Sequence, residues 1–487
     1  MTPADPATAE PCDLDALAAR RLIGARRLSP VALFDSCLAR IEAVNPAVNA
    51  IVTMDAGLGR AQAIAAERAV AEGRPLGPLH GLPVAIKDNR PVAGLRATYG
   101  SLLHAEDPPD TIDEPMIARL RAAGAVLFAR TNQPEFGTGA NTRNRVFGAT
   151  GNPFDPTRTP AGSSGGSAVA LATGMTPLAT GSDYGGSLRT PAAFCGVTGY
   201  RPSPGVVPMP GAASLLAPWA VNGPMARGLD DLCHLLDAMA FHDPRDAWSR
   251  PGPTRTAAEP VPDLASLRLA ISPDLGCCPV DAGIAQLFEA RMASLAGHAH
   301  VTRGAPDYGP AVHEVLEITR AVSFLATHAE RVAQHRDRLD TNLIDNVDRA
   351  HAYSAADVAR AEAEQAAMYR RSLAFFEDVD AVIAPAAAVS PFPHAQLFPE
   401  TVGGQVMPTY MRWLALAYAP TLCLSAVACI PCGLDVHGLP FGIQVIGPHR
   451  SDARTLAIAR ALERHFASHP ETMRPRPDLD RLASSAP

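Results

Sequence analysis

A long stretch without charge limits the folds that are open to this chain. From Thr159 to Ser182 the sequence contains no acidic or basic residue and is rich in Gly, Ala and Ser. Small residues let neighbouring backbones approach closely, so this composition suits a helix that is buried and tightly packed. We expect that helix over Ser167–Thr173, and a strand over Pro177–Thr180 soon after it.

Helical and strand patterns alternate on either side of this stretch. Apolar residues recur at helical spacing from Leu14 to Ile23, and Ser29-Pro30 is a start signal for a second helix that reaches Ile41. The α/β class is therefore expected, with a mixed β-sheet core covered by helices on both faces. Further helices are expected over 61–71, over 117–123 and within 310–375, and strands over 82–86, 125–129, 267–271, 381–384, 424–430 and 441–446.

The overall composition excludes several classes of protein. An apolar fraction of 47% beside a charged fraction of 19% is typical of globular chains and excludes wholesale disorder. The net charge is −7 and no basic block is present, so neither nucleic acid nor a membrane surface is expected as the principal partner. The nine Cys residues are scattered and odd in number, which argues against a disulfide framework and against a zinc site.

No targeting segment is expected. Met1–Asp15 lacks the positive and apolar regions of a signal peptide. Trp413–Leu434 is free of charge, but Pro420 and Pro431 interrupt it. We expect a helix that ends before Pro420 and then a buried strand rather than a membrane span, and we expect a cytoplasmic protein.

The chain contains a single lysine, Lys87, among 42 Lys and Arg residues. Lys differs from Arg because burial can lower its pKa toward neutral pH, where it can release its proton. A lone lysine in an arginine-rich chain is therefore a candidate general base. The alternative is chance retention in a chain with a general bias toward Arg.

Two serine clusters carry features that acyl transfer requires. They are Gly162–Ser167, which reads GSSGGS, and Asp183–Arg189, which reads DYGGSLR. Acyl transfer needs a nucleophile, a base and N–H groups aimed at the developing oxyanion, and paired glycines before a serine let the backbone turn its N–H groups inward. Gly-Ser runs are also typical of loops and close helix contacts, so that interpretation stays open for each cluster.

The first cluster also matches the GxSxG pattern of a nucleophile elbow, with Ser164 as the nucleophile. That motif follows directly on a strand, whereas Asp155–Pro160 contains two prolines and polar residues that make a poor strand. An esterase of the α/β-hydrolase type that uses Ser164 is kept as an alternative.

The motifs as a set resemble the amidase signature family. The resemblance is carried, in order, by Gly81–Asn89, Thr131–Phe136, the two serine clusters and Pro191–Gly196, with weaker matches at Pro431–Gly433 and Gly438–Gln444. It is closest over about 80–230 and extends to about 465. It implies one amidase domain, with an N-terminal helical section over 1–75, a core over 76–300 and 379–470, a helical layer near the substrate entrance over 301–378, and a tail over 471–487. The Pro-rich segment 251–263 is the best candidate for a linker.

The resemblance implies a Ser-Ser-Lys triad. Ser187 corresponds to the nucleophile and Lys87 to the base. Ser163 corresponds to the bridging serine, which in the family takes part in a cis peptide bond. The lysine count and the resemblance thus select the same Lys87. The implied oxyanion hole consists of the N–H groups of Tyr184, Gly185, Gly186 and Ser187.

The sequence departs from the usual family pattern at three positions near the implied site. Ala161 stands where Gly is frequent, Tyr184 where Thr or Ile is usual, and Arg201 where Lys is common. None of these belongs to the triad, although the bulk of Tyr184 is expected to alter the acyl pocket.

Three further residues lie near Ser187 in the sequence. Cys195 has no His partner nearby, and its motif is structural in the family, so we do not expect it to be catalytic. Asp183 and Arg189 flank the glycine turn, and we expect them to pair across it. The alternative is that both are solvated.

The expected function is hydrolysis of a carboxylic amide, or of a related ester or carbamate as in a urethanase, through an acyl-enzyme. In this scheme neutral Lys87 accepts a proton through Ser163 while Ser187 attacks. The alternatives are a glutaminase-like subunit of a tRNA-dependent amidotransferase and a non-catalytic binding protein on the same scaffold. No cofactor or metal is expected, because the fifteen His are dispersed and neither HExxH nor a Walker A sequence occurs. The expected partner is a small-molecule amide, with a homodimer as one option for assembly.

Overall fold

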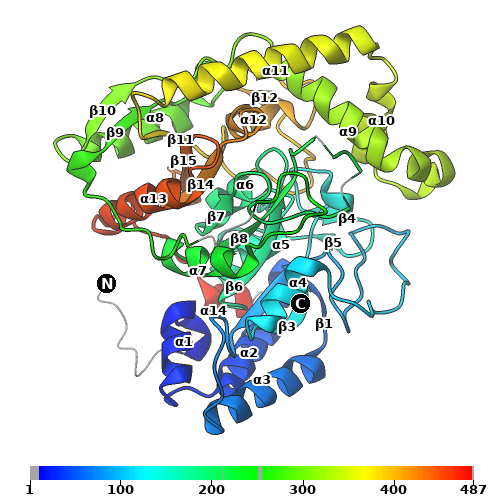
Figure 1. Cartoon of the computed structure of the whole chain (residues 1–487), viewed down its shortest axis with the longest axis vertical. Coiled ribbons are helices and arrows are strands. Elements are labelled where there is room, and N and C mark those ends of the chain that lie inside the picture. Colours follow the sequence, from blue (N-terminus) through cyan, green and yellow to red (C-terminus); the bar gives the residue numbers. More distant parts are fainter. Residues whose placement is uncertain (1–9, 212, 216, 251–254, 485–487) are drawn as a thin grey trace.

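One mixed sheet runs through the molecule and contains eleven strands of the described chain (Figure 1). The computed structural model describes residues 10–211, 213–215, 217–250 and 255–484. Parts of the expected N-terminal section, linker and tail, namely 1–9, 251–254 and 485–487, lie outside the described residues. In spatial order the strands are β1 (Ile51–Met54), β3 (Val126–Thr131), β2 (Pro83–Lys87), β6 (Leu178–Asp183), β8 (Val221–Ala226), β7 (Thr198–Arg201), β14 (Ala426–Leu434), β15 (Pro440–Gly447), β11 (Ala381–Pro385), β9 (Arg268–Ile271) and β10 (His300–Arg303).

The sheet combines parallel and antiparallel pairs. Strand β2 is parallel to both β3 and β6, and β9 is parallel to both β11 and β10. The strands between β6 and β11, and the edge strand β1, pair antiparallel with their neighbours. The expectation of a mixed α/β sheet is confirmed.

Helices cover both faces of this sheet, as expected. In β14 the side chains of Ala428 and Ile430 join one apolar cluster, whereas Val427 and Cys429 join the clusters on the other side. This alternation is the two-residue period of a strand that is buried on both faces. The helices are α1 (Ala16–Gly24), α2 (Pro30–Val48), α3 (Ala56–Ala71), α4 (Pro115–Ala122), α5 (Gly165–Ala172), α6 (Arg189–Cys195), α7 (Leu229–Met239), α8 (Ala282–Met292), α9 (Val312–His335), α10 (Thr341–Ala350), α11 (Ala355–Phe375), α12 (Ala415–Leu422), α13 (Asp452–Ala467) and α14 (Leu479–Ser484).

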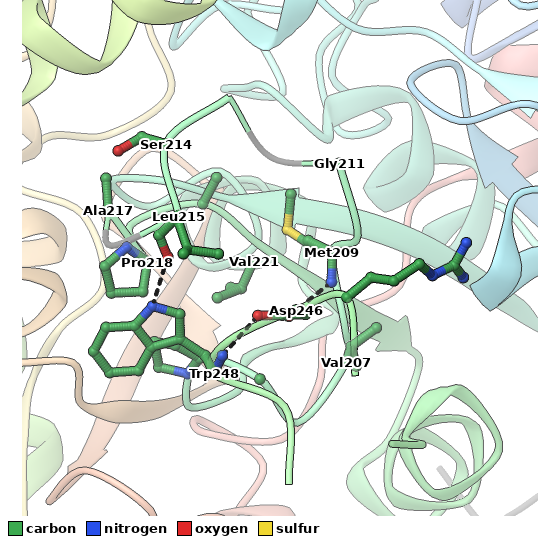
Figure 2. Close-up of a pocket in the computed structure, with 14 residues that line it drawn as sticks. Val207, Met209, Gly211, Ser214, Leu215, Ala217, Pro218, Val221, Asp246 and Trp248 are labelled. Carbon is green, nitrogen blue, oxygen red and sulfur yellow. Dashed lines mark hydrogen bonds between the residues drawn. The ribbon is translucent and has the colours of Figure 1, made fainter. Parts of the chain in front are cut away.

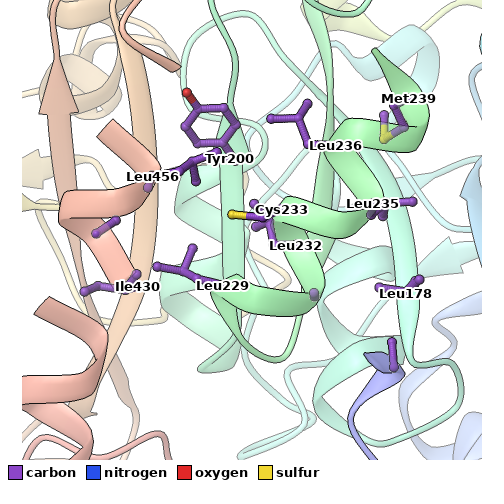
Figure 3. Packing of buried hydrophobic residues seen from close by; sticks show 14 of the residues in the cluster. Leu178, Tyr200, Leu229, Leu232, Cys233, Leu235, Leu236, Met239, Ile430 and Leu456 are labelled. Atoms are coloured by element: carbon purple, nitrogen blue, oxygen red, sulfur yellow. The ribbon is translucent and has the colours of Figure 1, made fainter. Parts of the chain in front are cut away.

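Helix α7 illustrates how a helix covers one face of the sheet. Its leucines at 229, 232, 235 and 236 point toward the strands, where they pack near Tyr200 of β7 and Leu178 of β6 (Figure 3). Burying a leucine side chain contributes about 1.5–3 kcal/mol. A stripe of this kind fixes α7 against the sheet, which in turn carries the residues of the candidate site.

The charge-free stretch folds as expected, with small shifts at its ends. Its helix, α5, begins at Gly165, two residues before the expected start, and every one of its residues is buried. Strand β6 continues to Asp183 instead of ending at Thr180. Ser29 caps α2 as expected, since its side chain accepts hydrogen bonds from the N–H groups of Val31 and Ala32, but the expected end at Ile41 is wrong because the helix continues to Val48.

The prediction that a helix ends before Pro420 is wrong. Helix α12 continues through Pro420 to Leu422. Proline cannot donate to the carbonyl of Leu416, but the side-chain amide of Gln444 donates to that oxygen at 2.6 Å. The proline is tolerated because a side chain from β15 replaces the missing donor.

Several elements were not predicted. Strand β1 lies within the section that reads as helical, and β7, β8 and β10 also went unrecognised because they lack a regular apolar alternation. Among the described residues, no helix is both long enough and apolar enough to cross a membrane. The remaining short elements are β4 (Arg143–Asn144), β5 (Gly148–Ala149), β12 (Thr401–Val402), β13 (Gln405–Val406) and the 3-10 turns Pro11–Asp13, Glu135–Gly137, Leu264–Ser266, Ala293–Leu295, Arg336–Arg338 and Arg412–Leu414.

Candidate active site

The single lysine ends the buried strand β2 and meets three serine hydroxyls. Lys87 has no exposed surface. Its Nζ lies within hydrogen-bond distance of Ser163 Oγ at 2.7 Å, Ser182 Oγ at 2.9 Å and Ser164 Oγ at 3.0 Å. None of the salt bridges between described residues includes this amine, so its polar surroundings are hydroxyl groups. An ammonium group placed in this way has few charges to compensate for its lost hydration.

The environment of Lys87 favours the neutral amine. Burial lowers its pKa to about 7, and Arg90 acts in the same direction, while Asp183 opposes the shift. The neighbouring Asp88 does not contact the amine. Its carboxylate accepts from Thr98 N at 3.1 Å and Thr98 Oγ1 at 2.5 Å, and lies 3.7 Å from Arg130 Nη1. The amine is therefore able to act as a proton acceptor near neutral pH.

The first serine cluster lies directly before α5. The peptide bond between Gly162 and Ser163 is cis, and Ser163 is 2% exposed. A Cβ at Gly166 would lie 2.3 Å from the backbone nitrogen of Asn132, so this glycine is required for the close approach of two backbones. That contact joins the cluster to the segment Thr131–Phe136, which the sequence also singled out.

The geometry around Ser164 does not support a nucleophile elbow. Ser164 has no exposed surface, and residues 155–160 form no strand. The Ser164 N–H donates to the carbonyl of Ser187 at 3.1 Å, which places the two serine clusters side by side. A strand, a sharp turn and an exposed serine are the defining parts of the elbow, and the first and last are missing here.

The second serine cluster forms the turn that follows β6. Asp183 pairs with Arg189 at 2.9 Å, and neither side chain is exposed, so the expected pairing across the turn is confirmed. Arg201 adds a contact at 3.5 Å to the same carboxylate. Although burial opposes ionisation, the two arginines and the N–H of Gly186 hold the pKa of Asp183 well below its usual range.

This turn leaves Ser187 accessible. Ser187 is half-buried, in contrast to Ser163 and Ser164, and its Oγ has no hydrogen-bond partner among the described residues. The N–H groups of Tyr184, Gly185 and Ser187 likewise have no acceptor within the described part of the chain. These groups are free to bind a ligand.

The structure differs from the expectation at Gly186. Its N–H donates to Asp183 Oδ1 at 2.9 Å, so this group holds the turn together instead of remaining free. The φ angle of Gly186 is +117°, which favours glycine. A Cβ there would lie 2.7 Å from Ala417 Cβ and 2.9 Å from Thr190 Oγ1.

Two further residues lie near the site, one that the sequence analysis did not name and one that it did not expect to be catalytic. Ser182 Oγ accepts from Lys87 and also from Asn89 Nδ2 at 3.2 Å. Ser182 is the last residue of the charge-free stretch and directly precedes Asp183. Its position beside the second serine cluster is the feature of the sequence that could have identified it as a site residue. Cys195 is fully buried, and burial raises the pKa of its thiol well above its usual value, so it is not a reactive thiolate.

Other cavities lie away from Lys87. Figure 2 shows one of about 230 Å³, in which Met209 N and Trp248 N both donate to Asp246 and Trp248 Nε1 donates to the carbonyl of Leu215. It contains no residue of the serine clusters. Within the described ranges, no three His, Cys, Asp or Glu side chains are placed to hold a metal ion.

The chain is similar to known proteins in both sequence and structure. A family model described as Amidase matches residues 32–456. An acylamidase from Rhodococcus erythropolis is 33% identical over 445 residues, which is 91% of this chain and 93% of that protein. One of the subunits of glutamyl-tRNA(Gln) amidotransferase from Chloroflexus aurantiacus is 33% identical over 499 residues, which is 95% of this chain and 98% of that protein. A bacterial aryl acylamidase of the amidase signature enzymes has the same fold, with a TM-score of 0.88 at 24% identity, and the match covers 97% of this chain and 99% of that one.

Proposed function

This chain belongs to the amidase signature family and is an amidohydrolase, and we propose that it cleaves carboxylic amides through an acyl-enzyme formed on Ser187. One contact carries the proposal, namely the 2.7 Å hydrogen bond between Lys87 Nζ and Ser163 Oγ. It joins an unexposed lysine, the only one in the chain, to the hydroxyl of Ser163, whose neighbour Ser164 is hydrogen-bonded to the backbone of the accessible Ser187. A structural cation would not need to be a lysine at this position, because Arg serves everywhere else.

The first half of the reaction forms the acyl-enzyme. Neutral Lys87 takes the proton of Ser163, Ser163 takes the proton of Ser187, and Ser187 Oγ attacks the amide carbonyl. The resulting tetrahedral intermediate collapses when its C–N bond breaks. The same relay returns the proton to the leaving amine, so Lys87 ends this half-reaction neutral again.

The second half releases the acid. Water gives its proton to the relay and attacks the ester carbonyl of the acyl-enzyme, and the Ser187 oxygen regains its proton as the ester bond breaks. In both halves the negative oxygen faces the N–H groups of Tyr184, Gly185 and Ser187. Removing one donor of such a hole typically lowers kcat by about 10²–10³-fold.

The substrate scope includes related acyl groups. Esters and carbamates carry the same carbonyl and expel an oxygen or nitrogen leaving group through the same relay, so urethanase activity belongs to the proposal. We further propose that the enzyme acts in the cytoplasm on small molecules, as a monomer or homodimer, without nucleic acid or membrane. The helical layer over 301–378 is proposed to border the substrate entrance.

Covalent labelling tests the assignment of the nucleophile. Incubation with a fluorophosphonate, followed by proteolysis and mass spectrometry, is expected to place the adduct on Ser187. The Ser187→Ala variant should remain unlabelled. An adduct on Ser164 would support the elbow mechanism and overturn the assignment.

A second candidate is the glutaminase-like component of an amidotransferase. It is favoured by the 33% identity to the amidotransferase component from Chloroflexus aurantiacus over nearly the whole chain. Such a component would pass ammonia to a partner and would depend on that partner for its activity. Hydrolysis of simple amides by the purified chain alone favours the independent amidase, whereas activity only with glutamine and a co-purified partner favours the amidotransferase.

A further inference from the structure

One face of α9 lies against the loops that carry the proposed catalytic groups (Figure 1). Arg320, Phe324 and Arg331 are spaced by four and seven residues, so they share that face. Arg320 Cζ lies 4.8 Å from the centre of the Tyr184 ring, and Arg331 Cζ lies 4.4 Å from the centre of the Phe136 ring. The helical layer therefore presents two cations and an aromatic ring to the core.

Both rings that it covers border the catalytic centre. Tyr184 precedes Ser187 by three residues in the oxyanion turn. Phe136 precedes Gly137, where a Cβ would lie 3.4 Å from Ser163 Oγ. Tyr184 and Phe136 are half-buried as residues, although the Tyr184 hydroxyl itself is fully buried. A substrate at Ser187 thus lies within the neighbourhood of this face.

Arg320 is buried without a counter-ion. Its side chain belongs to a residue that is 5% exposed, and no carboxylate among the described residues forms an ion pair with it. Its Nε donates to Asn346 Oδ1 at 2.9 Å, and its Nη2 donates to the hydroxyl of Tyr410. Its Nη1 has no partner in the described part of the chain and is not among the fully buried unpartnered atoms, so this atom keeps some exposed surface.

Three other buried arginines are paired with carboxylates, whereas Arg227, at 6% exposure, forms no ion pair among the described residues and donates instead to the backbone carbonyls of Thr176 and Leu14. Arg130, Arg189 and Arg201 have no exposed surface, and each lies within 4.0 Å of an Asp carboxylate. The rings of Tyr184 and Phe324, at 4.8 and 4.2 Å from Arg320, attract a cation but do not neutralise it. Burying an unpaired charge is costly, and a carboxylate is the natural partner of a guanidinium because it accepts two parallel hydrogen bonds.

We propose that Arg320 binds a carboxylate of the substrate, so that the preferred amides are anionic. This inference rests on the proposed amidase function and names its substrate class. The carboxylate would accept from the free Nη1 while the amide carbonyl lies at Ser187. The two neutral acceptors, Asn346 and Tyr410, would hold the guanidinium in place without competing for its charge.

Matched substrate pairs test the proposal. In the first pair, succinamate carries a carboxylate on the acyl side where levulinamide carries an acetyl group. In the second pair, para-acetamidobenzoate carries a carboxylate on the amine side where para-acetylacetanilide carries an acetyl group. The wild-type enzyme is expected to prefer the carboxylate of at least one pair by about tenfold or more in kcat/KM. In that pair Arg320→Met should remove the preference through a raised KM, while Arg320→Lys should retain part of it.

The ratio of the two kcat/KM values within a substrate pair separates an effect on carboxylate binding from an effect on folding. A variant that is merely less well folded loses activity on both members equally and leaves the ratio unchanged. Arg412→Met is the matched control, because Arg412 already pairs with Glu317 at 2.7 Å, and it should not change the ratio. A wild-type enzyme without preference in either pair, or an Arg320→Met variant that keeps the preference, would overturn the proposal. If the neutral substrates are cleaved by the wild type but not by Ser187→Ala, the amidase function stands regardless of that outcome.

Discussion

At the scale of single residues, the arrangement around Lys87 was only partly accessible from sequence. The lysine count singled out Lys87 from the residues alone, and the family resemblance added Ser163. The contacts of Lys87 with Ser164 and Ser182 were not predicted, because they depend on how β2, β6 and the start of α5 come together in space. The use of the Gly186 N–H by Asp183 depends likewise on the path of a turn that the sequence does not specify.

Two neighbouring glycines of that turn should respond differently to substitution. Gly186→Ala places a Cβ 2.7 Å from Ala417 Cβ at a φ of +117°, so we expect kcat to fall by about 100-fold or more. Gly185→Ala places a Cβ 2.8 Å from the end of the flexible Met411 side chain and at an ordinary contact distance of 3.6 Å from Tyr418 Cβ, so it should stay within about tenfold of the wild type. Steady-state kinetics on one amide compares them, with thermal unfolding as the control. Equal losses of kcat in both variants would show that the backbone conformation of the turn does not determine the activity.

At the scale of elements, local rules predicted where α2 begins but not every helix end, since α2 continues past the expected Ile41 to Val48 and α3 begins at Ala56 instead of 61. Ser29 capped α2 as its sequence suggested, because an N-cap acts within one turn. The rule that proline ends a helix failed at Pro420, because Gln444 of β15 supplies a donor that is remote in sequence. Strands β7 and β8 were missed for a related reason, since pairing with neighbours in the sheet defines them more than their own residues do.

The role of Gln444 predicts coupling with Pro420. Gln444→Met removes the donor to the carbonyl of Leu416 and should destabilise the protein by about 1–3 kcal/mol. In a Pro420→Ala background the new backbone N–H bonds that carbonyl instead, so the cost of Gln444→Met should be smaller by roughly 1 kcal/mol. Denaturant unfolding of the four proteins measures this coupling. An identical cost in both backgrounds would mean that Gln444 does not replace the missing donor.

At the scale of the whole molecule, the sheet brings together groups that are far apart in the chain. β2 and β6 are neighbouring parallel strands, so their carboxyl ends, with Lys87 and the turn of Ser187, lie at the same edge. The mixed sheet with helices on both faces was expected from alternating patterns. The position of α9 above Tyr184 and Phe136 was not, because helical periodicity shows that a face is buried and not what it is buried against.

The assembled site also predicts independence from metal ions. The proposed relay uses an amine, hydroxyl groups and backbone N–H groups only, so exhaustive dialysis against EDTA should leave kcat unchanged. The activity of dialysed and untreated enzyme on the same amide gives the comparison. A loss of activity that zinc or manganese restores would contradict the proposed chemistry.

The central claim is that Lys87 is a base, and its replacement by arginine tests this most directly. Arginine keeps the positive charge, but it cannot give up its proton near neutral pH. We expect Lys87→Arg to be as inactive as Lys87→Ala when kcat is measured on the same amide, with folding of both variants checked by circular dichroism. An active Lys87→Arg enzyme would contradict the account, because it would show that only the charge at this position is needed.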